Sequence, residues 1–182
     1  MKLAEEKYVL DGKEITLRSA KPEEAQMLID HLKIVTGETR FLMSEPDEIR
    51  FTQKEEEEFI NEHNEAKDSM LALAFVDGEY AGNCSFESMA GSRRTGHRAG
   101  IGIALSQKYT GFGLGRLMLK RILAKVQEVG FEQVELTVVG NNHRAYRLYE
   151  SLGFKECGRI PNANKYGDGT YAEDILMALQ FK

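Results

Sequence analysis

The sequence predicts an α/β (α+β) fold in which about four helices flank a mixed, mostly antiparallel sheet of about seven strands with one central parallel pair. Two observations predict the antiparallel part. Asp77-Gly78 joins two apolar runs as a hairpin, and the chain closes with two strand-like runs. A third observation predicts the parallel pair, because residues 99–140 read as strand, glycine turn, helix and strand. Strands joined through a helix run parallel, since a crossover of that length is what such pairing needs.

Chain length predicts one compact domain over residues 1–182, because a chain of this length can bury a core of its own. Its formal net charge of −5 argues against a general nucleic-acid binder. No apolar run approaches the roughly 18 residues that span a bilayer, and the acidic N-terminus lacks the apolar core of a secretory signal. The two cysteines, Cys84 and Cys157, are too few for a disulfide framework. We therefore expect a cytoplasmic protein with reduced thiols and no membrane or nucleic-acid partner.

The first half of the chain predicts a strand and two helices. Polar and apolar residues alternate at 14–18, which is typical of a strand. Ser19–Pro22 supply a capping serine and a proline near the first turn of a helix, which Gly37 ends. A capping box formed by Thr52 and Glu55 begins the second helix.

An acidic segment, residues 44–58, surrounds the start of that second helix. It carries seven carboxylates and only two basic residues. One interpretation is a solvated helix face whose acids suit the helix dipole. The other is that some of these carboxylates attract a cationic substrate. The sequence leaves both open.

The remaining elements follow from the same rules of periodicity and turn chemistry. Their predicted ranges are strands at 70–76, at 79–89 and from Arg98, a helix at 115–130, a strand at 133–140, a helix from Asn142, and strands at 154–160 and 171–181.

Three glycines at every second position, Gly111, Gly113 and Gly115, precede the helix that begins near Arg116. Glycine lets a chain wrap closely around an anion, and the helix end adds partial positive charge, so a pyrophosphate is a natural ligand. A P-loop is excluded because no Lys-Ser or Lys-Thr follows these glycines. A dinucleotide-binding turn fits poorly, because residues 106–110 separate the turn from the strand. A tight turn without any ligand stays as the structural alternative.

Two motifs at the right separation resemble the acetyl-CoA-binding core of the GNAT family of N-acetyltransferases. The family's turn pattern, Gln/Arg-x-x-Gly-x-Gly/Ala, falls on residues 110–115, with Thr110 where Gln or Arg is usual. Its second pattern, Asn-x-x-Ala-x-x-Leu-Tyr-Glu-x-x-Gly-Phe, is matched throughout from Asn142 to Phe154. The resemblance implies a single GNAT-like domain, acetyl-CoA as cofactor, and acetyl transfer to a primary amine of a small molecule or a peptide by direct attack.

The same resemblance assigns cofactor-binding and catalytic residues. The backbone of Ile103, Ala104 and Leu105 would bind the pantetheine arm of the cofactor. The main chain of the turn would bind its diphosphate, through Thr110, Gly111, Phe112, Gly113, Leu114, Gly115 and Arg116. Asn142 would add a polar contact, and Tyr149 would contact the cofactor and protonate the leaving thiolate. Alternatively, Asn142 only caps its helix and Tyr149 is a core aromatic.

The general base is not evident from the sequence. Many relatives carry a glutamate in a pattern like His-x-Ala-Glu-x-Gly, and Gly100 stands at that position here. The candidates are Glu87 and His97, each acting through water. Nothing basic marks Cys84 as an activated nucleophile, and we expect no metal site.

Two other function classes stay open on the sequence. The missing glutamate leaves room for a catalytically weak module that binds or senses acyl-CoA. A nucleotide-dependent oxidoreductase would use the same glycines, although their spacing is wrong for it. A homodimer is also open, because dimers are common among similar proteins.

Overall fold

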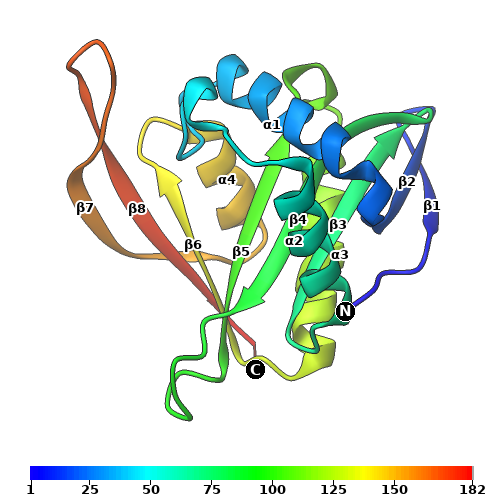
Figure 1. Ribbon diagram of the computed structural model, residues 1–182. Coiled ribbons are helices and arrows are strands. Elements are labelled where there is room, and N and C mark those ends of the chain that lie inside the picture. Colours follow the sequence, from blue (N-terminus) through cyan, green and yellow to red (C-terminus); the bar gives the residue numbers. More distant parts are fainter. Residues whose placement is uncertain (182) are drawn as a thin grey trace. The chain divides into compact units, whose positions relative to one another are not determined.

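The computed structural model describes residues 1–181, which contain eight strands and four α-helices. The strands form one mixed sheet in the order β1-β2-β3-β4-β5-β6-β8-β7 (Figure 1). Its one parallel pair among the described residues joins β5 to β6. The predicted fold class is therefore confirmed, with one strand more than expected.

The elements lie close to their predicted positions. The strands are β1 (Glu6–Leu10), β2 (Lys13–Ser19), β3 (Ser69–Val76), β4 (Glu79–Ser88), β5 (Arg98–Leu105), β6 (Gln133–Val139), β7 (Lys155–Lys165) and β8 (Tyr171–Gln180). The helices are α1 (Ala25–Glu38), α2 (Gln53–Glu65), α3 (Leu114–Val129) and α4 (His143–Ser151).

Three predictions of extent were wrong. The sequence analysis missed β1, which pairs antiparallel with β2 across a turn where Asp11 and Gly12 both have positive φ. Strand β7 continues to Lys165, past an irregularity between Ile160 and Asn164 that includes Asn162 at φ +54°. Helix α1 begins only at Ala25, after a 3-10 turn over Pro22–Glu24, and it runs through Gly37.

The chain divides into two compact units. The first unit comprises residues 1–87 and 102–122, and the second comprises residues 88–101 and those from 123 onward. Each is described by itself below. The prediction that residues 1–182 make a single N-acetyltransferase domain stays a prediction.

In the first unit, β1, β2, β3 and β4 pair antiparallel in sequence order. The predicted hairpin turn at Asp77 and Gly78 has positive φ at both residues, as that turn type requires. Helices α1 and α2 pack on one side of β3, in front of it in Figure 1. Their shared core consists of Ala20, Ala25, Leu28, Ile60, Leu71 and Leu73.

In the second unit, β8 lies between β6 and β7 and is antiparallel to both. Residues 98–100 of β5 run parallel to residues 133–135 of β6, which confirms the predicted crossover. Helix α4 buries Tyr149, whose ring meets Phe154 edge-on at 6.0 Å between centroids. No helix within residues 1–181 is both long and apolar enough to cross a membrane.

Candidate active site

The glycine turn of the first unit presents main-chain amides at the start of α3. Gly111 and Gly113 are exposed and have φ of +104° and +100°, conformations that glycine adopts without strain. The first intrahelical bond runs from the Leu117 N–H to the Gly113 carbonyl, at 3.1 Å. The amides of Leu114, Gly115 and Arg116 precede that bond and therefore have no acceptor within the helix. This is the geometry that binds a phosphate group.

Thr110 is the residue at which the turn departs from the family pattern. Its hydroxyl donates to the Gln107 carbonyl at 2.6 Å, so the side chain closes the preceding 3-10 turn. The departure therefore changes a side chain that is bound locally and leaves the main chain of the turn in place.

Strand β4 fixes the segment that leads into the turn. The Tyr109 hydroxyl donates to Glu79, and Lys108 Nζ pairs with the same carboxylate at 2.9 Å. Tyr109 is buried, although its neighbours on both sides in sequence are more exposed. A buried aromatic ring and an ion pair thus anchor the residues that directly precede the glycine turn.

The end of β5 carries the predicted pantetheine-binding residues Ile103, Ala104 and Leu105, all half-buried. Strand β4 approaches this segment so closely at Gly82 that a Cβ there would lie 2.1 Å from the Ala104 carbonyl oxygen. Gly82 also has a φ of +147° beside a register shift in β4. Glycine is therefore required at this position, and the close approach fixes the backbone of Ala104.

Tyr149 in the second unit combines a buried ring with an unpaired hydroxyl. The side chain is 9% exposed, and burial raises the pKa of the phenol to about 12. Within residues 1–181 its hydroxyl takes part in no hydrogen bond, and no fully buried side-chain oxygen lacks a partner. The hydroxyl is thus protonated at neutral pH and reaches the molecular surface. Both the core reading and the acid reading fit this geometry.

Asn142 caps α4. Its side-chain oxygen accepts from the Ala145 N–H at 3.2 Å, which confirms the capping interpretation. A contact from Asn142 to the cofactor stays a prediction.

Both candidate bases are exposed. Glu87 lies near the end of β4 in the first unit. His97 precedes β5 in the second unit, where its carbonyl accepts from the N–H groups of Glu132 and Gln133. Their roles stay predictions.

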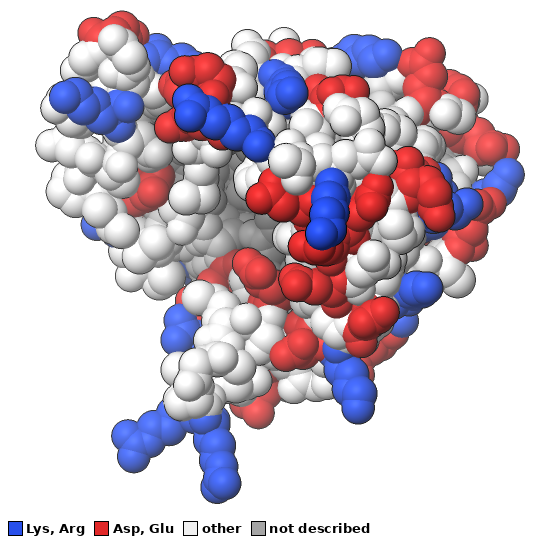
Figure 2. All heavy atoms as spheres, viewed as in Figure 1, with Lys and Arg blue, Asp and Glu red and all other residues white. Residues whose placement is uncertain are grey.

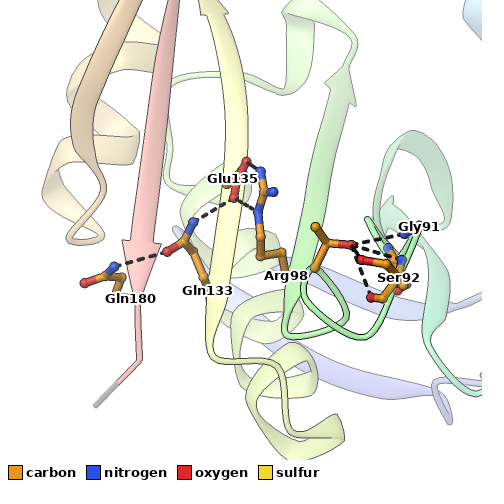
Figure 3. A network of polar contacts seen from close by, with 9 residues as sticks. Gly91, Ser92, Arg98, Gln133, Glu135 and Gln180 are labelled. Carbon is orange, nitrogen blue, oxygen red and sulfur yellow. Dashed lines mark hydrogen bonds and ion pairs between the residues drawn. The ribbon is translucent and has the colours of Figure 1, made fainter.

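A second carboxylate, Glu135 on β6, pairs in register with Gly100, which stands where the family pattern given above has glutamate. Figure 3 shows Arg98 reaching this carboxylate from the neighbouring strand. The two nitrogens of Arg98 donate to it at 2.5 and 2.6 Å, and Gln133 donates at 2.7 Å. The Arg98 guanidinium holds the pKa of Glu135 below its ordinary value. A carboxylate bound in this way is a poor base.

Sequence reasoning did not single out Glu56 from its neighbours. Four consecutive glutamates lie in the first two turns of α2. The Glu55 carboxylate accepts from the Thr52 N–H, Glu57 accepts from the Gln53 side chain, and Glu58 pairs with Lys54. Glu56 is half-buried, and within residues 1–181 it has no hydrogen-bonding or ionic partner.

The environment of Glu56 disfavours its charge. Burial raises the pKa of this carboxyl group. Burial also raises the pKa of Tyr80 on β4, and the nearby Glu56 carboxylate raises it further. Figure 2 shows acidic side chains gathered over the part of this face where α2 lies in Figure 1. Glu56 is thus an uncompensated carboxylate among paired ones, and a helical wheel of the sequence could have shown its inward position.

Comparison with known proteins decides the family. The profile of the acetyltransferase (GNAT) family matches residues 38–154, more than half of the chain. The chain belongs to the GNAT family. Its acetyltransferases use acetyl-CoA, so the predictions of family, enzyme class and cofactor are confirmed at that level.

Sequence relatives of this GNAT protein differ in length and in named activity. YwnH of Bacillus subtilis (strain 168), provisionally named a phosphinothricin acetyltransferase, is 24% identical over 162 residues, which cover 89% of this chain and 97% of YwnH. The ribosomal protein bS18-alanine N-acetyltransferase of Escherichia coli (strain K12) is 36% identical over 77 residues, which cover 42% of this chain and 51% of that enzyme.

Solved structures show the same fold. A GNAT-family acetyltransferase from Streptococcus pneumoniae superposes with a TM-score of 0.87 at 28% identity, covering 92% of this chain and 99% of that one. The yncA protein of Salmonella typhimurium, solved with its cofactor acetyl-CoA, gives a TM-score of 0.81 at 17% identity, covering 92% and 94%.

Proposed function

We propose that this GNAT protein is an acetyl-CoA-dependent N-acetyltransferase that moves the acetyl group to a primary amine of a small molecule or a peptide. The observation that carries the proposal is the pair of positive-φ glycines whose turn leaves the first amides of α3 without helical acceptors. Those amides would bind the diphosphate, and the half-buried end of β5 would bind the pantetheine arm through its backbone.

The chemistry is direct attack. The neutral amine nitrogen forms a bond to the thioester carbonyl carbon, which gives a tetrahedral oxyanion. Its collapse would break the C–S bond, Tyr149 would donate its hydroxyl proton to the departing thiolate, and the proton that the attacking nitrogen loses as the amide forms would return to Tyr149 through solvent. The raised pKa keeps this hydroxyl protonated at neutral pH, as a proton donor must be, and it also makes the phenol a weaker acid than an exposed tyrosine. The proton lost by the ammonium passes to water or to a base, for which Glu87 and His97 remain the candidates.

The acceptor class follows from charge. An alkyl amine arrives as an ammonium, because its ordinary pKa is about 10. Glu56 is half-buried and uncompensated, so an ammonium beside it would relieve the cost of its burial. We therefore propose a cationic primary amine as acceptor. Relatives named for bS18 alanine and for N-alpha acetylation support a peptide amine, and YwnH supports a small molecule.

A second candidate, an acyl-CoA-sensing module with weak catalysis, is favoured by one observation. Gly100 replaces the usual glutamate, and the carboxylate in register with it is held by Arg98. Such a module would bind CoA and release none of it as free thiol in the presence of amines.

One assay separates the candidates. The protein is incubated with acetyl-CoA and a panel of polyamines, aminoglycosides, amino acids and short peptides, and free CoA thiol is measured. Amine-dependent thiol release supports the enzyme. Calorimetric CoA binding without release for any amine supports the module. Absence of both CoA binding and release contradicts either assignment.

Location and assembly remain proposals. The two free cysteines and the CoA donor are consistent with a cytoplasmic protein. A homodimer is tested by light scattering of the purified chain.

A further inference from the structure

A buried histidine on α1 lies at the junction of the two predicted cofactor-binding segments. His31 is 6% exposed, and its Nε2 lies 3.0 Å from the hydroxyl of Ser106, which is equally buried. Ser106 directly follows the end of β5 and precedes the 3-10 turn that leads into the glycine turn. A single side-chain contact therefore reaches the residue that connects both segments.

Two residues of β4 also contact the His31–Ser106 pair. The Ser106 N–H donates to the Ala81 carbonyl at 3.1 Å, and the His31 ring stacks obliquely on Tyr80 at 4.5 Å between centroids. Burial lowers the pKa of His31, more than its hydrogen bond to the Ala81 backbone and the Glu38 carboxylate raise it. The ring is thus neutral at pH 7, with one nitrogen that donates and one that accepts.

Helix α1 holds the junction at a second point two turns later. Glu38 accepts from the Gln107 N–H at 2.8 Å, and its carbonyl accepts from the Gln107 side chain at 2.7 Å. Residues seven apart lie on one face of a helix. One face of α1 therefore hydrogen-bonds to two successive residues, Ser106 and Gln107, just before the glycine turn.

We propose that His31 is a positioning residue for acetyl-CoA, which holds Ser106 so that the end of β5 and the glycine turn keep the relative geometry that binds the cofactor. The inference rests on the proposed function, because it needs these two segments to be the binding segments. His31 is not itself one of the predicted cofactor-binding residues. Its effect should therefore appear in cofactor affinity and much less in turnover at saturation.

The experiment measures CoA affinity by calorimetry, KM for acetyl-CoA, kcat and Tm for five proteins. These are the wild type, His31→Leu, Ser106→Ala, His31→Gln and the control His63→Leu. His63 is a second buried histidine of the same unit, and within residues 1–181 its ring hydrogen-bonds only to the Phe59 carbonyl of its own helix α2. Glutamine keeps both a donor and an acceptor, so it tests rescue by a conservative side chain.

We expect His31→Leu and Ser106→Ala to raise Kd for CoA and KM for acetyl-CoA about tenfold each, with kcat within about threefold of wild type. A sixth protein, the His31→Leu/Ser106→Ala double variant, should be little worse than either single variant, because both substitutions remove the same hydrogen bond. His31→Gln should stay within about threefold, and His63→Leu should lower Tm without moving Kd.

Unchanged Kd in a folded His31→Leu protein, or an equal loss in His63→Leu, overturns the inference. If His31→Leu does not fold, Ser106→Ala decides alone, because it deletes one hydroxyl, and a wild-type Kd in that variant overturns the inference too. Failure of the wild type to bind CoA overturns the proposed function instead, and the inference with it.

Discussion

At the scale of single residues, the proposed chemistry depends on polar groups that have no hydrogen-bonding partner within residues 1–181. Tyr149, which is buried, and Glu56, which is half-buried, are two of these, and burial raises the pKa of each. Burial without a partner costs free energy, and a ligand that supplies the partner recovers it. Two separate predictions follow from these residues: Tyr149 should affect protonation of the leaving thiolate, and Glu56 should affect binding of the amine acceptor.

Tyr149→Phe should lower kcat about 100-fold or more, since a positioned general acid contributes at least that much. CoA affinity and Tm should change little, because the buried ring and its contact with Phe154 are kept. Since the pKa is raised to about 12, ionisation of this hydroxyl should not slow the wild type below about pH 10. The matched control is Tyr146→Phe on the same helix, whose hydroxyl donates to Glu156. An unchanged kcat in Tyr149→Phe removes this residue as the acid.

Glu56→Gln should raise KM for a cationic acceptor about tenfold, equivalent to roughly 1.4 kcal/mol, and leave CoA affinity unchanged. Glu58→Gln is the control, because that glutamate lies on the same helix but is exposed and pairs with Lys54. Steady-state kinetics with the best amine from the panel measure both. Equal effects in the two variants would mean that the acidic segment acts only through its net charge.

At the scale of elements, local rules predicted most of the fold. The capping box of Thr52 and Glu55 begins α2 as expected, and Asp77-Gly78 turns the central hairpin. Strand β1 was missed because its side chains alternate only between half-buried and exposed positions, so the apolar pattern is weak. Its pairing with β2 also needs the positive-φ turn at Asp11 and Gly12, which was not recognised in the sequence. Strand β7 runs further than predicted because pairing with β8 overrides the local turn preference of Asn162.

At the scale of the whole molecule, the sequence predicts which residues bind the cofactor but not which residues support them. The contacts of Ser106 with His31 span 75 residues, and those of Arg98 with Glu135 span 37. Contacts between residues so far apart leave no local pattern, so the supporting residues emerged only with the structure. Helical spacing could have shown that Glu56 lies on the inward face of α2, but not that it lacks the partners that its three neighbours have.

The central claim, that the main chain of the glycine turn binds the diphosphate of CoA, is tested by calorimetry of CoA with Gly113→Val and Gly130→Val. Gly113 and Gly130 precede and follow α3, and they have nearly the same φ, +100° and +99°. A Cβ would meet Leu10 at an ordinary 3.7 Å in the first case and nothing within 4 Å in the second. Backbone strain is therefore matched, and thermal unfolding checks that both variants fold.

Gly113→Val should weaken CoA binding by about 100-fold or more, because two charge-assisted hydrogen bonds of roughly 1.5–3 kcal/mol each are lost. Gly130→Val should bind CoA as the wild type does. Wild-type affinity in a folded Gly113→Val protein would contradict the claim.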